Sequence, residues 1–274
     1  MSLSLRDRIA IAIYPERVVW LRAGKGRRAE VTGKGIVPCQ AEAGTSWRGA
    51  LVAVPEALAA AGAASTQVSV LLSNRLMRYA ISSNPDSANS REELDMMARH
   101  AFERTHGEAA SGWDIRLSDA APGCSALVSA VDRELVVALR DSVGAAGAQL
   151  VSLQPYLMAA FNRQAETMPN AGGIFVLAEP ERLCHVAWKS GGWCAVQQIH
   201  ADCSRPIGLH DTLDRMAMTQ DLDTNRAVRF CAPEFHSNLA AGGRWEIETT
   251  PLTWPAGLVP EEHGAWAGAM LALN

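Results

Sequence analysis

The sequence contains no long hydrophobic run. The apolar stretch of residues 9–13 is far shorter than the roughly 20 residues that a transmembrane helix needs, and no small-residue cleavage site of a signal peptide follows it. No other segment reaches about 18 consecutive apolar residues. We therefore expect a cytosolic protein.

The sequence also lacks an excess of positive charge and any paired cysteine motif. It has 25 Lys and Arg against 29 Asp and Glu, a net charge of −4, which leaves no basic stripe for nucleic acid and no polybasic arm for an anionic membrane. The six cysteines are scattered without a CxxC pair, so we expect small buried hydrophobic residues in a reducing compartment. The 274 residues, 48% of them apolar, suffice for one large domain or two lobes.

Strand-like and helical patterns alternate along the chain, which predicts an α/β fold with mixed sheets. The expected strands cover residues 9–13, 18–21, 29–37, 68–72, 76–81, 113–117, 124–131, 150–153, 173–178, 183–188, 193–199, 227–231 and 245–249. The expected helices cover residues 46–61, 90–106, 133–143, 155–164, 209–218 and 262–273. We expect Pro55 to kink or split the first helix, Ser90 and Asp132 to cap theirs, and Pro155 to begin one.

One short pattern occurs twice. Residues 12–21 (AIYPERVVWL) parallel residues 177–186 (LAEPERLCHV), and both contain Pro-Glu-Arg within a strand–turn–strand pattern. Internal similarity of this kind predicts a structural repeat. The alternative is a chance match of a tripeptide in a common supersecondary unit.

Several short sequence motifs together resemble those of a known family. They are Arg78-Tyr-Ala-Ile before an acidic helix ending in Phe-Glu-Arg-Thr-His-Gly, then Trp113-Asp-Ile-Arg, residues 127–132 (LVSAVD) and residues 150–162 (LVSLQPYLMAAFN). In this order they resemble the actin-like platform proteins of type IV pili and type II secretion, the PilM and GspL families and MshI. The resemblance implies a two-lobed actin-like, ribonuclease H-like fold with mixed sheets. It predicts a first lobe with an inserted subdomain over 1–166 and a reduced second lobe over 167–274.

In nucleotide-binding members of this superfamily, the first turn of each lobe carries Asp, then Gly, then small hydroxyl residues. The resemblance places the two turns on Ala12, Tyr14, Pro15, Glu16 and Arg17, and on Leu177, Ala178, Glu179, Pro180, Glu181 and Arg182. Proline removes an amide donor, a carboxylate repels phosphate, and Asp-x-Gly occurs nowhere in the chain. We therefore expect degenerate phosphate turns, no nucleotide cofactor and no catalytic residue.

The resemblance also implies a role in assembly. Such relatives sit at the inner face of the inner membrane and capture a short segment of a single-pass partner, so it implies a non-catalytic cytoplasmic scaffold that binds protein. By type and location, Arg78, Tyr79 and Trp113 are the candidate contact residues, with burial in the core as the alternative for the two aromatic ones. An active ATPase or kinase-like enzyme of the same superfamily is the alternative function, and an α/β module of another fold is the third.

Other chemistry is weakly supported. The residues Cys184, His185, Cys194, His200 and Cys203 include zinc-ligand types, but a hairpin turning at 189–192 would place Cys194 opposite Ala187 and leave no compact ligand pair. Gly123-Cys-Ser-Ala-Leu lacks the closing glycine of a nucleophile elbow. Gly24-Lys-Gly and Gly33-Lys-Gly lack the spacing of a phosphate-binding loop and are interpreted as turns with solvated lysines. We expect no metal.

Overall fold

The computed structural model describes residues 7–24, 30–40, 47–82, 90–169, 171–203, 208–220, 227–235 and 243–273. They form two compact units. Unit 1 comprises Met1–Met77, Asp132–Arg163 and Leu252–Asn274, and unit 2 comprises Arg78–Val131 and Gln164–Pro251. The final segment thus belongs to the unit of the N-terminal strands, whereas the predicted division at residue 166 assigns it to the second lobe.

Unit 1 is built on a five-stranded mixed sheet. Its strands are β1 (Arg8–Ile13), β2 (Arg17–Ala23), β3 (Val31–Pro38), β4 (Gln67–Leu72) and β8 (Gln149–Pro155). Their order is β3-β2-β1-β4-β8, with antiparallel pairing from β3 to β1 and parallel pairing from β1 to β8. Strand β1 is buried along nearly its whole length, as expected for a central strand covered on both faces.

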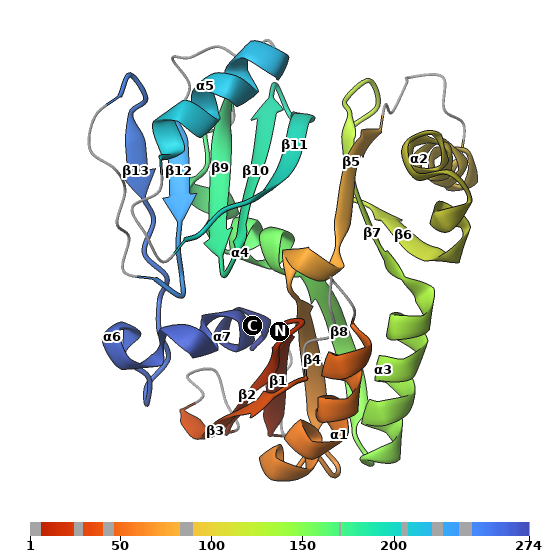
Figure 1. Cartoon of the computed structure of the whole chain (residues 1–274), viewed down its shortest axis with the longest axis vertical. Helices are drawn as coiled ribbons and strands as arrows, with labels where there is room; N and C mark the ends of the chain where they lie inside the picture. Colours follow the sequence, from red (N-terminus) through yellow and green to blue (C-terminus); the bar gives the residue numbers. More distant parts are fainter. Residues whose placement is uncertain are drawn as a thin grey trace. The chain divides into compact units, whose positions relative to one another are not determined.

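Helices cover both faces of this sheet (Figure 1). They are α1 (Arg48–Ala61), α3 (Arg133–Ala145) and α7 (Ala267–Ala272). Two further helices are α4 (Tyr156–Gln164) and α6 (Pro260–His263), and short 3₁₀ turns lie at Asn74–Leu76 and Gly264–Trp266 in unit 1 and at Ala165–Thr167 in unit 2. Helices α1 and α3 lie side by side, and α7 packs on β1 and β4. Gly62 ends α1 in the left-handed region at φ 66°, where glycine carries no steric penalty.

Unit 2 repeats the sheet of unit 1. Its strands are β9 (Gly172–Glu179), β10 (Arg182–Lys189), β11 (Gly192–His200), β12 (Val228–Cys231) and β13 (Ile247–Thr249), in the order β11-β10-β9-β12-β13. The strand directions match those of the first sheet one for one. The predicted strand–turn–strand repeat is therefore confirmed. Helix α5 (Leu209–Gln220) packs its apolar side on this sheet.

A small sheet completes unit 2. It consists of β5 (Arg78–Ser82), β7 (Ala126–Asp132) and β6 (Trp113–Leu117), in that order, with α2 (Arg91–His106) and a 3₁₀ turn at Gly107–Gly112 packed against it. The predicted cap of α2 is confirmed, because Ser90 Oγ accepts a hydrogen bond from the Glu93 amide at 3.2 Å. None of the helices in the described parts of the chain is both long enough and apolar enough to span a membrane.

Pro55, expected to kink or split the first helix, lies inside a continuous α1 and does not split it. Two local predictions about helix ends are wrong. Asp132 occupies the N-cap position of α3 without a side-chain cap bond; its Oδ2 instead accepts a hydrogen bond from Trp47 Nε1 at 3.0 Å. Pro155 ends β8 rather than beginning α4. In addition, the expected last helix is divided into α6, a 3₁₀ turn and α7.

The glycines of Gly33-Lys-Gly also differ from the prediction of a turn. They lie inside the edge strand β3, beneath the indole of Trp20 on the neighbouring strand. A Cβ atom at Gly35 would come within 2.6 Å of Trp20 Nε1, so the ring requires a residue without a side chain there. Lys34 is not simply solvated, because its ammonium group contacts His263 Nε2. The predicted turn at Gly24-Lys-Gly lies largely outside the described residues.

Candidate functional site

The first predicted phosphate turn is a tight hairpin. Three residues, Tyr14, Pro15 and Glu16, separate β1 from β2, and the Tyr14 amide donates to the Arg17 carbonyl at 2.9 Å. Tyr14 is fully buried, with its ring edge-on to Tyr156 at 6.3 Å between centroids and the Arg17 guanidinium 4.4 Å from its centroid. The proline has no amide hydrogen, and the tyrosine side chain belongs to the core.

The acidic residue of this turn is held by arginines. Arg75 Nη1 donates to Glu16 Oε2 at 2.7 Å, and Arg17 Nη1 lies 3.7 Å from Glu16 Oε1. Both guanidinium groups are partly buried, which strengthens such a pair relative to one in bulk water. The two cations closest to the turn are thus directed at a carboxylate of the protein itself.

Ala12 occupies the position where the resemblance expects a metal-organising aspartate. It is fully buried, and its methyl group faces Gly268 of α7, where an added Cβ would lie 3.1 Å away. An alanine offers no ligand to a divalent cation, which prefers oxygen donors. The small side chain of Ala12 instead allows α7 to approach the sheet closely.

The second turn has the same construction. Glu179 pairs with Arg182 across the end of the β9–β10 ladder, and Pro180 and Glu181 form the connection. Glu181 has a φ of 60°, a left-handed conformation that a non-glycine residue adopts at some cost. Glu179 is fully buried. Burial, reinforced by the charge of Glu179, raises the pKa of the nearby Cys203 thiol to about 11.

The three predicted contact residues lie in the small sheet of unit 2, but not on one surface. Arg78 and Trp113 come together, with the guanidinium 5.8 Å from the ring centroid. Trp113 is only 9% exposed and packs edge-on against Phe102 at 5.7 Å. Tyr79 follows Arg78 on the same strand, so its side chain points to the opposite face. Burial, then the charges of Cys184 and Glu179, raises the pKa of its phenol.

The zinc-type residues do not gather. The β10–β11 ladder has a bulge, so that Ala187 pairs with Ala195 and Trp188 with Trp193, and Cys194 has no opposite residue. The predicted pairing of Cys194 with Ala187 is therefore wrong, and this thiol is exposed. Within the described ranges, no group of three or more His, Cys, Asp or Glu side chains is arranged to hold a metal ion.

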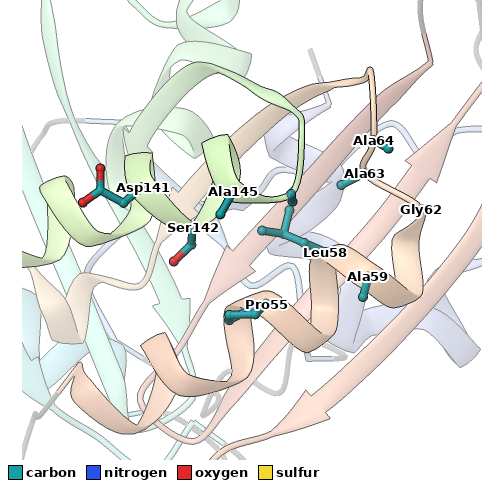
Figure 2. A pocket seen from close by; sticks show the side chains of 10 residues that line it. Pro55, Leu58, Ala59, Gly62, Ala63, Ala64, Asp141, Ser142 and Ala145 are labelled. Atoms are coloured by element: carbon teal, nitrogen blue, oxygen red, sulfur yellow. The ribbon is translucent and has the colours of Figure 1, made fainter.

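The sequence did not reveal a groove on unit 1 between the C-terminal halves of α1 and α3. Figure 2 shows side chains of both helices and of the loop after α1 around it. Its volume is about 680 Å³, and its lining consists of Pro55, Leu58, Ala59, Gly62, Ala63, Ala64, Asp141, Ser142, Ala145 and Ala146. Most of these residues are small and apolar. The available signal was that the sequence from residue 57 to 64 contains no charge.

Comparisons with known proteins identify the fold by structural similarity and not by sequence. No protein-family profile matches the chain, and no curated protein is similar to it in sequence. Among solved structures, the cytoplasmic domain of EpsL, an inner membrane component of the type II secretion system of Vibrio cholerae, has a TM-score of 0.56 at 16% identity and covers 90% of both chains. The PilM–PilN type IV pilus biogenesis complex has a TM-score of 0.53 at 17% identity, over 79% of this chain and 66% of that one.

A third structure bears on the fold class. It is a Bacteroides thetaiotaomicron protein of unknown function with an actin-like ATPase fold, which matches with a TM-score of 0.56 at 8% identity over 86% of this chain and 84% of that chain. The likeness extends over most of each chain and agrees with the two sheets of identical strand order. The chain therefore has the actin-like fold that its internal repeat and short sequence motifs predict.

Proposed function

We propose that this chain is a non-catalytic cytoplasmic scaffold at the inner face of the inner membrane, in a type IV pilus or type II secretion platform, where it binds a short segment of a single-pass membrane protein. The observation that supports the proposal most strongly is the likeness to the EpsL cytoplasmic domain over 90% of both chains. The PilM–PilN complex adds support for a protein partner, since the similar structure was solved with one.

The geometry of the two turns supports the non-catalytic part of the proposal. Each turn contributes a proline without an amide donor and at least one glutamate, which repels a phosphate. In the first turn, Arg75 and Arg17 contact Glu16, so the cations that could neutralise a phosphate already face a carboxylate. We propose that both turns are degenerate relics of phosphate-binding turns, retained as hairpin connections.

Titration with Mg-ATP tests this part. Were the dissociation constant about 10 μM, about 1 mM nucleotide would raise the free energy of unfolding by about 2.7 kcal/mol. We expect no heat of binding by calorimetry and no change in the melting temperature, with actin as the positive control. Saturable binding accompanied by phosphate release or sugar phosphorylation would instead establish the alternative function, an active ATPase or kinase-like enzyme.

The partner-binding part predicts a role for Arg78. Its guanidinium lies over the Trp113 ring, a contact between the two outer strands of the small sheet. The probes are synthetic peptides that cover the cytoplasmic segments of single-pass membrane proteins whose genes lie next to the gene for this protein. We expect one of them to bind, and we expect Arg78→Ala to weaken its binding about tenfold, which corresponds to about 1.4 kcal/mol.

Arg116 provides the matched control. It lies on β6 of the same small sheet with an exposed side chain, and we expect Arg116→Ala to change the affinity by less than about twofold. Equal effects of the two substitutions would show that Arg78 has no specific role. Tyr79 and Trp113 are less suitable for this test, since packing of Trp113 against Phe102 means that its removal also disturbs the core.

A further inference from the structure

We infer that the α1–α3 groove of unit 1 is a docking surface for a basic amphipathic helix, the cytoplasmic juxtamembrane helix of the membrane partner. This inference rests on the proposed function for the identity of the partner, and it assigns to the groove the juxtamembrane segment, a different segment from the one that Arg78 contacts. The groove, its shape and its charge come from the residues of unit 1 alone.

The groove has room for a short stretch of helix. Its volume is about 680 Å³, and on α1 its lining runs from Pro55 to Gly62, about 11 Å at the usual helical rise. Small residues at Ala59, Gly62 and Ala145 line it and allow the backbone of another helix to approach closely. Ridges of a third helix can therefore settle between α1 and α3.

Each of the two helices also carries an exposed valine outside the groove lining. Val52 of α1 is 81% exposed and Val137 of α3 is 47% exposed. Val52 precedes Pro55 by three residues, and Val137 precedes Asp141 by four, spacings that place each valine on the same helical stripe as a groove residue. A helix seated in the groove could cover both side chains.

Asp141 is the one charged residue among the described residues that line the groove, and its negative charge favours a basic occupant. The Ser142 hydroxyl donates a hydrogen bond to the Ala138 carbonyl at 2.8 Å. At the end of α1, Arg22 Nη1 donates to the carbonyls of Ala61 and Gly62 at 3.1 and 3.2 Å.

The last turn of α3 contains no basic residue of its own, although a helix C-terminus carries a partial negative charge. A Lys or Arg of the occupant would therefore meet Asp141 and the α3 terminus together. Cytoplasmic juxtamembrane segments carry an excess of Lys and Arg, which matches this requirement.

Arginine substitutions in the full chain test the inference. Ala59 and Ala60 are both exposed residues near the end of α1, but only Ala59 lines the groove. With the bound juxtamembrane peptide as the probe, we expect Ala59→Arg to weaken binding at least about tenfold, through steric exclusion and a desolvated charge. The matched control Ala60→Arg should leave the affinity within about twofold. We expect Asp141→Lys to weaken binding about tenfold for a lysine-bearing peptide, and less when its lysines are replaced by glutamine.

The outcomes separate this inference from the proposed function. If a peptide binds but only Arg78→Ala weakens it, the groove inference is wrong and the proposed function stands. If none of the peptides binds, both fail. If sedimentation shows a concentration-dependent dimer that Ala59→Arg dissociates, the occupant is a second copy of this chain and the inference is again overturned. Circular dichroism and melting of each variant verify that it folds.

Discussion

Replacing Tyr14 by alanine will lower the free energy of unfolding by about 3–5 kcal/mol. The side chain is fully buried between the sheet and α7, and it packs edge-on against Tyr156. Removing it deletes a large buried area and leaves a cavity that α7 and Tyr156 can fill only in part. Urea denaturation of the full chain at neutral pH, followed by far-ultraviolet circular dichroism, measures the loss.

Conservative substitutions show whether packing is the cause. Tyr14→Phe keeps the ring and should cost less than Tyr14→Ala. A methyl group at Gly268 would lie 2.4 Å from the Tyr14 hydroxyl oxygen, so Gly268→Ala should destabilise the wild type by about 1–3 kcal/mol and the Tyr14→Phe background by less. Additive effects in this double-mutant cycle would contradict the proposed contact. A small cost of Tyr14→Ala would indicate that the turn is not part of the core.

Acidification from pH 6.5 to pH 4 will remove about 3 kcal/mol of stability through His185 alone. This histidine is fully buried in β10, and burial lowers its pKa to about 4, with the Gln197 backbone opposing the shift in part. The unfolded chain protonates the same ring near pH 6.5. Between these values the unfolded state binds more protons than the folded state, so stability rises with pH in this window and becomes independent of His185 above it.

A comparison of variants isolates this contribution. Urea denaturation at several pH values between 7.5 and 4 should give a shallower pH dependence for His185→Leu than for the wild type. Carboxylates titrate equally in both proteins, so the difference between the two curves belongs to His185. His200 on β11 is exposed, and His200→Gln should retain the wild-type slope. Parallel curves for the wild type and His185→Leu would show that the ring is already protonated or hydrated in the folded protein.

The order of elements was predictable because it depends on residues close together in sequence. Apolar spacing located the strands that form both five-stranded sheets, and the Ser90 cap of α2 involves a residue only three positions away. The two Pro-Glu-Arg turns indicated the repeat, since a turn this short is determined by its own residues and the strands beside it. The strand order of the two sheets confirms this repeat.

For the candidate sites, the sequence predicted which residue types take part but not which side chains come together. Tyr79 and Arg78 are neighbours in the sequence, but the alternation of a strand sends them to opposite faces. The bulge that leaves Cys194 without an opposite residue changed the expected register of β10 and β11. A one-residue difference in register decides which side chains meet, and no local pattern specifies it here.

The sequence by itself determined the α/β class, the repeated strand–turn–strand unit and the unusual composition of both turns. Only the tertiary structure decided that Arg75 reaches Glu16 from 59 residues away, that α7 packs on β1, and that α1 and α3 enclose a groove. The physical reason is the range of the interactions. Propensity, capping and turn chemistry act over a few residues, whereas ion pairs, close helix contacts and grooves arise where distant segments pack together.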